Sequence, residues 1–338
     1  METHSQNVVI KPLTIAIQML AEVKHAIVLF AAMCLVFFGN SFALGQATGV
    51  LTPIQGTPAL QNQATSDFQF LVCGDSRPDA GNDPLPAQLP EILTAAQKLK
   101  PAFIIFVGDT IYGWNPTSEN QIAGQYRLFC NLMAKAKVPV FNCPGNHEMG
   151  DQNDRPNATM AAFYSKYMSA PYGSFTYGNS TFIALNTEEI PPPGTPPAPA
   201  FYGNISAGYV SAAQLAWLAD QLEQNKKQEN VFIFMHHPLH GRGRAGQLRD
   251  TCGDAIRKII SNYPNVAYVI GGHEHLYFNP QNPNNFSVPP QRTPGGPTQF
   301  VVTGGAGAPL FKMPGNFHHY LVFSVDGKSV NVKLVRVN

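Results

Sequence analysis

The chain is poor in charged side chains and in cysteine. Asp, Glu, Lys and Arg together make up 13% of its 338 residues and nearly balance, leaving a formal net charge of +1. No basic run is present, so a dedicated nucleic-acid-binding surface is not expected. The four cysteines that follow the N-terminal region are scattered and none has CxxC spacing. Buried thiols and disulfide bridges therefore both remain open.

An apolar run at residues 26–39 is shorter than the roughly 20 residues that a membrane-spanning helix needs. It follows Lys24, and the small residues at 41–43 suit a signal peptidase. Residues 1–43 are therefore predicted to be a signal peptide that exports the chain to the periplasm or the medium, with no membrane span after cleavage. Cleavage after Ala47 and an uncleaved N-terminal anchor are the alternatives.

The part of the chain that follows divides into a linker and one domain. Residues 44–66 are small, polar and turn-rich, which is typical of a linker, and the domain is predicted to occupy residues 67–338. Its first half alternates short apolar strands with amphipathic helices, which indicates a largely parallel sheet. The segments that carry this pattern are 68–75, 86–100, 102–109, 121–136 and 138–145.

The second half is less regular. Residues 174–187 form a predicted hairpin that turns at Gly178 and Asn179, and a proline-rich loop follows at 188–204. The chain ends in strands without intervening helices, at 299–305, 318–325 and 330–337. A parallel half followed by an antiparallel end predicts an α/β fold in which two sheets pack together with helices outside.

Good metal ligands gather where the predicted strands end. Carboxylate and amide oxygens and imidazole nitrogens are the donors that first-row divalent or trivalent cations prefer. In open α/β sheets, chemistry collects at the carboxyl ends of the strands. An Asp after a strand is alone a weak signal, because it is more often a turn former, whereas GNHE (145–148) is more specific. The joint occurrence of the motifs predicts a site. The residues are Asp75, Asp109, Asn146, His147, His236, His273 and His275.

In these motifs the chain resembles the calcineurin-like metallophosphoesterase superfamily. The shared features are an Asp-x-x motif at Asp75, a GD-x-x-Y motif at 108–112, GNHE (145–148), a lone strand-end histidine and GHEH (272–275), over roughly residues 68–338. The segment GDTIY (108–112) resembles the purple acid phosphatase branch. The resemblance implies a four-layer sandwich of two mixed β-sheets flanked by α-helices.

The resemblance also implies two metal ions and a role for each residue. Asp109 would bridge both ions. Asp75 and His275 would complete the first site, with Tyr112 as a further ligand. His147 would act on the phosphate as a hydrogen-bond donor or general acid. The remaining ligands, which would hold the second ion, are Asn146, His236 and His273.

The chain departs from the family pattern at Arg77, which stands where the wider family has histidine and purple acid phosphatases have glycine. Arginine cannot deprotonate to bind a metal. Arg77 either forms a salt bridge with Asp79 or Asp83, or it is a catalytic cation that grips a phosphate oxygen. If Tyr112 binds, the first ion is expected to be Fe(III), paired with divalent Fe, Zn or Mn; otherwise both are divalent Zn, Mn or Fe.

Three functions follow as hypotheses. The first is an exported phosphomonoesterase acting on a small phosphate ester, in which two cations clamp the phosphoryl oxygens and activate a water. The second is a phosphodiesterase or nucleotidase of the same fold. The third is a non-catalytic metal- or phosphate-binding protein. Among the other histidines, His237 is expected behind the site or in the core. His240, Arg242 and Arg244 either line its mouth or are solvated.

Overall fold

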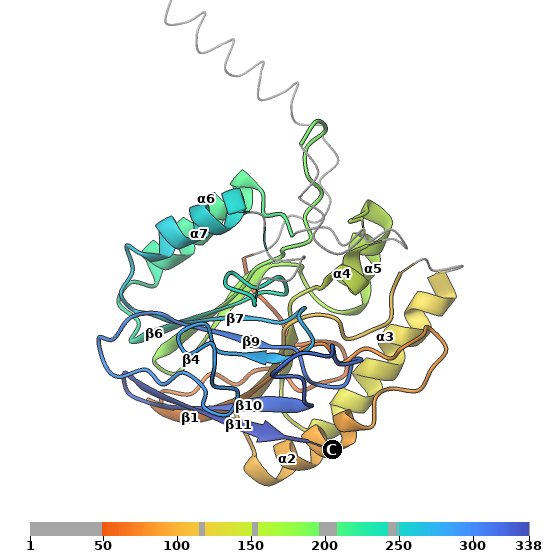
Figure 1. Ribbon diagram of the computed structural model, residues 1–338, viewed down its shortest axis with the longest axis horizontal. Helices are drawn as coiled ribbons and strands as arrows, with labels where there is room; N and C mark the ends of the chain where they lie inside the picture. The colour runs from red at the N-terminus through yellow and green to blue at the C-terminus, as the bar shows by residue number, and fades with distance from the viewer. Residues whose placement is uncertain are drawn as a thin grey trace, which may run out of the picture. The chain divides into compact units, whose positions relative to one another are not determined.

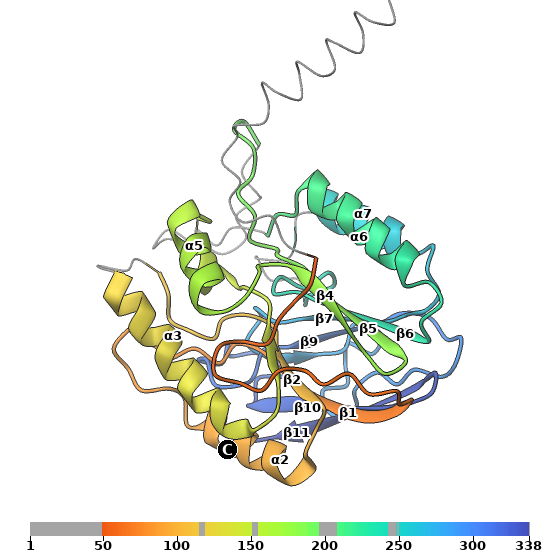
Figure 2. The same ribbon diagram turned by 180° about the vertical axis from the view of Figure 1, so that it is seen from behind.

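Two mixed β-sheets face each other at the centre of the domain, with helices on both outer sides (Figures 1 and 2). The computed structural model describes residues 49–114, 119–150, 155–195, 208–242, 248 and 250–337. The architecture confirms the predicted two-sheet α/β sandwich, and the order of the strands shows how the chain builds it.

The first sheet has the strand order β11-β10-β1-β2-β3. Strands β1, β2 and β3 are parallel, while β10 pairs antiparallel with both β1 and β11. Parallel neighbours place their carboxyl ends at one edge. The bounds are β1 (Asp67–Cys73), β2 (Phe103–Phe106), β3 (Val140–Asn142), β10 (His319–Asp326) and β11 (Ser329–Arg336).

The second sheet has the order β4-β5-β6-β7-β9-β8. The expected hairpin is present as β4 and β5, and β5, β6, β7 and β9 run parallel to one another. The C-terminal strands therefore do not form one antiparallel end, because β9 joins the second sheet and β10 and β11 return to the first. The bounds are β4 (Gly173–Tyr177), β5 (Ser180–Ala184), β6 (Asn230–Phe234), β7 (Val266–Gly271), β8 (Tyr277–Phe278) and β9 (Gln299–Thr303).

An aromatic core joins the inner faces of the two sheets. Phe70 of β1 packs against Phe323 of β10 at 4.8 Å between ring centroids, and against Phe182 and Phe232 of the second sheet at 5.1 Å each. Successive strand residues point to opposite faces, so β1 is buried on both. The rings on its inner face meet the second sheet, while Leu71 contacts the helices outside.

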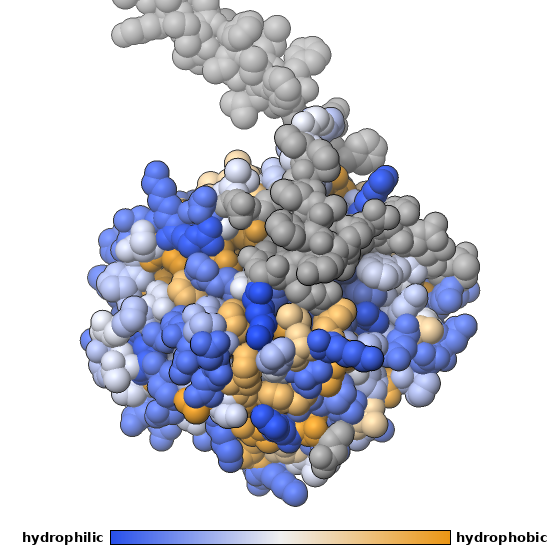
Figure 3. Space-filling view, viewed as in Figure 1, coloured by the Kyte–Doolittle hydropathy of each residue, from blue (hydrophilic) through white to orange (hydrophobic). Residues whose placement is uncertain are grey.

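Helices cover both outer faces. Helix α2 turns Leu89, Ile92, Leu93 and Ala96 inward, a spacing that puts them on one side of the helix. The outer surface of the α6–α7 layer is largely hydrophilic (Figure 3). The first sheet is covered by α2 (Gln88–Leu99), α3 (Glu119–Met133), the short 3₁₀ helix η1 (Ala134–Ala136) and α5 (Ala158–Tyr167), and the second by α6 (Ala212–Gln224) and α7 (Asp250–Ile260).

The four cysteines after the N-terminal region are free and buried, which decides between the two alternatives left open above. Within the described residues no helix is long and apolar enough to cross a membrane. The predicted signal segment 1–43 lies outside the described residues, so export and the alternative of an anchor stay predictions.

Residues 49–54, at the start of the expected linker 44–66, make main-chain hydrogen bonds to the domain. The Leu51 N–H donates to Ser174 O at 2.9 Å, and the Ile54 N–H donates to Val140 O at 2.8 Å. Both side chains are buried. Residues 49–54 therefore pack onto the domain. The apolar side chains of Leu51 and Ile54 are buried beside the two sheets.

This packing predicts that Ile54→Ala lowers the free energy of unfolding by about 2–5 kcal/mol, the usual cost of truncating a buried aliphatic side chain. Val50→Ala is the matched control, because Val50 is 60% exposed. Urea unfolding of the full chain measures both. Equal, near-zero effects of the two substitutions would mean that the segment does not belong to the folded domain.

Candidate metal centre

The candidate ligands lie at the carboxyl ends of strands from both sheets. Asp75 follows β1, Asp109 follows β2, and Asn146 begins the short helix α4 (Asn146–Met149) after β3. His236 follows β6 and His273 follows β7 in the second sheet. The sequence-predicted residues therefore meet where the parallel strands of the two sheets end.

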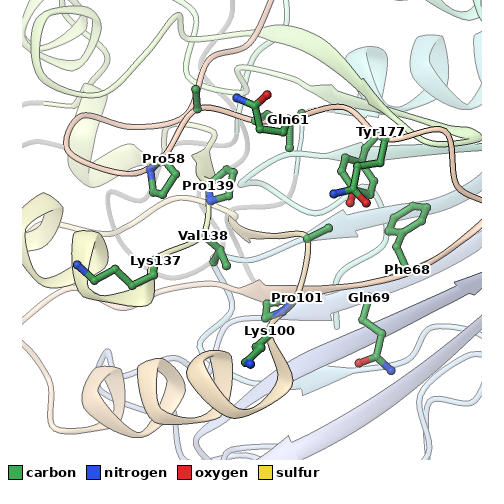
Figure 4. Close-up of a pocket in the computed structure, with 14 residues that line it drawn as sticks. Pro58, Gln61, Phe68, Gln69, Lys100, Pro101, Lys137, Val138, Pro139 and Tyr177 are labelled. Atoms are coloured by element: carbon green, nitrogen blue, oxygen red, sulfur yellow. The ribbon is translucent and has the colours of Figure 1, made fainter.

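A separate cavity of about 430 Å³ lies at the opposite, amino ends of β1, β2 and β3 (Figure 4). Phe68, Pro101, Pro139 and Tyr177 contribute to its lining. None of the candidate ligands lines this cavity. It is therefore distinct from the metal centre.

Four donor atoms converge at the predicted second metal site. Asn146 Oδ1 lies 2.9 Å from His236 Nε2 and 3.1 Å from His273 Nδ1. The two imidazole nitrogens are 3.1 Å apart, and Asp109 Oδ1 is 3.4 Å from His236 Nε2. Donors bound at about 2.1 Å to one cation lie about 3.0–3.4 Å apart in octahedral or tetrahedral geometry. The arrangement fits a first-row divalent cation.

The predicted first site is formed by Asp75, Asp109 and His275. Each offers a donor atom within 4.8 Å of the other two, and all three residues are buried. His275 Nε2 lies 3.3 Å from Asp75 Oδ1, which is itself buried without a hydrogen-bond donor. A buried carboxylate oxygen without a partner is costly, and a cation bound there would satisfy it. The donors present therefore fit a metal at this site as well.

Main-chain carbonyls orient two of the imidazoles. His236 Nδ1 donates to Val107 O at 2.8 Å, and His275 Nδ1 donates to Pro309 O at 2.6 Å. In each ring this leaves Nε2 facing the other donors. Carbonyl partners of this kind fix the tautomer and the ring orientation of metal-binding histidines.

Four of the predicted ligands have a strained, left-handed backbone conformation. Asp75, Asp109, His273 and His275 have φ angles of 56°, 54°, 68° and 42°. Non-glycine residues in this left-handed region cost of order 1–3 kcal/mol each and persist where the surrounding structure enforces them. Four of the seven non-glycine residues with positive φ among the described residues are these predicted ligands, and strain gathered at one place is a mark of a functional site.

Two glycines let the loops approach closely enough. A Cβ at Gly108 would lie 2.6 Å from His236 Nδ1, and a Cβ at Gly145 would lie 2.3 Å from Asp109 Oδ1. Both distances are far inside van der Waals contact. The glycine before Asp109 and the glycine before Asn146 are therefore required by space around the site.

Glu148 is the residue that the sequence interpretation left without a role. Its buried carboxylate accepts hydrogen bonds from the N–H groups of Gly145 and Asp109 at 2.7 and 2.9 Å. It also accepts from the Thr110 N–H and hydroxyl at 2.6 and 2.8 Å and from the Ile111 N–H at 3.2 Å. In the sequence, the signal for this role was the position of Glu148 as an acidic residue directly after His147, in GNHE.

The two carboxyl groups of the first site have opposite pKa shifts. Burial raises the pKa of Asp109 well above its usual range, and the nearby charges of Asp75 and Glu148 add to the effect. Burial also acts to raise the pKa of Asp75, but the nearby imidazoles of His275 and His236 and the hydrogen bond from the His273 N–H together lower it. A cation between the two carboxylates would favour the ionised form of both.

His147 stands apart from the metal donors. Its Nδ1 donates to the Tyr112 carbonyl oxygen, and its Nε2 lies 3.8 Å from Asp109 Oδ2. Burial, followed by the charge of Arg77, holds the pKa of His147 well below its usual range. This placement agrees with the separate role predicted for His147, which itself stays a prediction.

Arg77 turns toward the centre. Its Nε lies 3.9 Å from Asp109 Oδ2, and its Nη1 donates to Pro78 O at 3.0 Å. Among the described residues, Asp109 rather than Asp79 or Asp83 is its ionic partner. A guanidinium in this position is available to an anion bound at the centre. Its role as a catalytic cation stays a prediction.

Tyr112 is the remaining predicted ligand. Its carbonyl oxygen contacts His147, and its ring centroid is 5.9 Å from that of His147. Within the part of the chain that the structure describes, its hydroxyl makes no contact with the donors described above. Ligation by Tyr112 stays a prediction.

The other histidines lie around the centre. His237 Nδ1 is 2.5 Å from Glu188 Oε1, and its ring packs 4.2 Å from that of His273, behind this predicted ligand. His240 packs against Phe300 at 4.5 Å. Arg244 lies outside the described residues.

The comparison with protein families identifies this arrangement. A sequence model of the calcineurin-like phosphoesterases matches residues 68–277, more than half of the chain. The chain therefore belongs to the calcineurin-like phosphoesterase family. The finer assignment to a purple acid phosphatase-like branch stays a prediction.

Two curated relatives illustrate the range within the family. The chain is 24% identical over 179 residues to a 3',5'-cyclic adenosine monophosphate phosphodiesterase of Escherichia coli, covering 49% of this chain and 54% of the relative. It is 24% identical over 227 residues to a manganese-dependent ADP-ribose/CDP-alcohol diphosphatase of Xenopus tropicalis, covering 54% and 66%. The chain thus spans between about half and two thirds of the length of these relatives.

Solved structures show the same fold. A dimetal phosphatase from Danio rerio is similar with a TM-score of 0.53 at 16% identity, over 80% of this chain and 99% of the other. The anchor protein GAP50 of the Plasmodium inner membrane complex is similar with a TM-score of 0.52 at 12% identity, over 80% and 85%. At these identities the likeness concerns the fold alone.

The hydrogen bonds of Glu148 predict a large effect of Glu148→Gln. The amide presents an N–H group to N–H donors, so at least one buried donor loses its acceptor, and we expect the free energy of unfolding to fall by about 2–4 kcal/mol. Glu223→Gln is the control, because Glu223 is 56% exposed and should leave stability close to wild type. Urea unfolding compares the two variants. Stability of Glu148→Gln equal to that of the control would contradict the assigned role.

Proposed function

We propose that the chain is a binuclear-metal hydrolase that cleaves a phosphodiester or diphosphate bond in a small, nucleotide-like substrate. The observation that carries the proposal is the position of Asp109. One of its oxygens belongs to the donor group of Asn146, His236 and His273, and its carboxylate also groups with Asp75 and His275. One residue shared by two donor sets is the arrangement expected of a two-metal site.

The substrate class departs from the phosphomonoesterase favoured by the sequence. The curated relatives described above are named for action on a cyclic phosphodiester and on diphosphates. The resemblance to purple acid phosphatases depended on Tyr112. These points favour the second sequence hypothesis over the first. Export, which depends on residues 1–43, remains part of the proposal.

The donors also favour a kind of metal. Oxygen and imidazole donors suit divalent Mn, Zn or Fe at both sites. When bound, two such cations polarise the phosphoryl oxygens and lower the pKa of a coordinated water.

The side chains around the metals have separate tasks. Arg77 offers a guanidinium to a non-bridging phosphate oxygen. His147 presents Nε2 on the Asp109 side of the centre, where it can contact the phosphate or the leaving oxygen. Because its Nδ1 proton is held by the Tyr112 carbonyl, it can give a proton from Nε2 as the imidazolium, a form that a bound phosphate anion favours.

A substrate panel tests the proposed function. With the full chain loaded with Mn²⁺, we expect kcat/KM for a bis-aryl phosphodiester to exceed that for the corresponding aryl monoester. Asp109→Ala should abolish both activities, because the shared ligand is lost, whereas the exposed Asp79→Ala should keep them. A higher kcat/KM for the monoester would return the chain to the phosphomonoesterase hypothesis, and no turnover of any phosphate ester would favour a binding protein.

Optical spectra test the metal proposal. With divalent cations at both sites, the Mn²⁺-loaded chain should be colourless and active, and Tyr112→Phe should keep the metal content by elemental analysis. The contrary result is an iron-loaded, oxidised chain with a visible absorption band that Tyr112→Phe removes. A phenolate–Fe(III) bond would then be present, and Tyr112 would be a ligand of the first site.

A further inference from the structure

Residues 112–114 enclose His147 from several sides. The Tyr112 carbonyl accepts its Nδ1 proton, and the Trp114 N–H donates to His147 O at 3.4 Å. The indole ring of Trp114 stacks on the imidazole, with 3.8 Å between ring centroids and 18° between planes. Residues 112–114 therefore contact both the main chain and the imidazole ring of His147.

The local backbone is adapted to this contact. A Cβ at Gly113 would lie 1.6 Å from His147 O, so only glycine fits there. Trp114 itself has a φ of 31°, which is unfavourable for a bulky residue. The Gly113 N–H donates to Gln125 Oε1 of α3 at 2.9 Å, which ties the segment to the helix layer. The strained backbone at Trp114 thus places the indole on the imidazole of His147.

The contact uses the face of the indole and not its N–H group. Its Nε1 is buried and has no acceptor among the described residues. A buried N–H without an acceptor costs about 1–3 kcal/mol. A phenylalanine would cover the same imidazole face without that cost. What the stack uses is therefore an aromatic ring face, which phenylalanine shares.

We propose that Trp114 is a positioning residue that fixes the plane of the His147 imidazole. A ring held by a single hydrogen bond at Nδ1 can swing about that contact. The stacked indole blocks this motion and keeps Nε2 on the Asp109 side, 3.8 Å from Oδ2. The inference rests on the proposed function, in which this nitrogen acts on the phosphate or its leaving oxygen.

Kinetics with two leaving groups test the proposal. We compare phosphodiesters that release either an acidic nitrophenol or an alkyl alcohol, using the full chain loaded with Mn²⁺. Trp114→Ala should lower kcat for the alkyl ester about 10- to 100-fold and that for the nitrophenyl ester much less, because only the poor leaving group needs a well-placed proton donor. Trp114→Phe should restore most of the loss. Metal content should stay at the wild-type level in both variants.

A double-mutant cycle with His147→Ala distinguishes an effect of Trp114 through His147 from a general effect of Trp114→Ala on the structure. If Trp114 acts through His147, adding Trp114→Ala to His147→Ala should change kcat little further. Equal losses for both leaving groups, or independent losses in the double variant, would overturn the proposal. Trp217→Phe is the control, because Trp217 lies on α6 away from the centre and should leave kcat unchanged.

Fluorescence tests the stack without turnover. The chain has two tryptophans, so Trp217→Phe leaves Trp114 as the single one. Removing the stacked imidazole by His147→Ala should then change the intensity of Trp114 emission, and unchanged emission would overturn the stack. A chain that shows this change but hydrolyses no phosphate ester would refute the proposed function and not the contact. Turnover without selective loss in Trp114→Ala would refute the positioning role alone.

Discussion

The buried carboxylate of Glu148 is the interaction on which the site depends. It accepts five hydrogen bonds, and all of them come from the turn that begins α4 or from the loop after β2. Hydrogen bonds to an ionised acceptor are stronger than neutral ones. The same group therefore holds Asp109, which is shared by both donor sets, and the turn that carries Asn146 and His147. Two loops from neighbouring strands become one rigid unit, as a metal site requires.

Much of the fold could be predicted because the strands are apolar on both faces and alternate with helices. The continuous run before Asp109 indicates a buried parallel strand, and parallel neighbours bring their carboxyl ends together. This rule alone assembles Asp75, Asp109, Asn146, His236 and His273. The return of β10 to the first sheet could not be predicted, because a strand that is apolar on both faces carries no mark of its partner. The packing of Leu51 likewise depends on a surface that exists only after the sheets form.

The details of the site depend on contacts that leave no pattern in the sequence. An arginine after Asp75 is compatible with a surface salt bridge, and only the folded chain turns Arg77 toward Asp109. The carbonyl of Tyr112, which any residue could supply, is the group that meets His147. The stacking of Trp114 on that imidazole follows from the path of the backbone through Gly113. Side-chain types predict which donor groups meet at the strand ends, whereas main-chain groups and ring stacking appear only in the structure.

The central claim is that Asp109 joins two metal sites. It is tested most directly by anomalous diffraction from crystals of the chain grown with Mn²⁺. The account predicts two anomalous peaks about 3.5–4 Å apart with the Asp109 carboxylate between them. One peak should lie beside Asp75 and His275, and the other within the group of Asn146, His236 and His273. A single peak, or two peaks of which only one contacts Asp109, would contradict it.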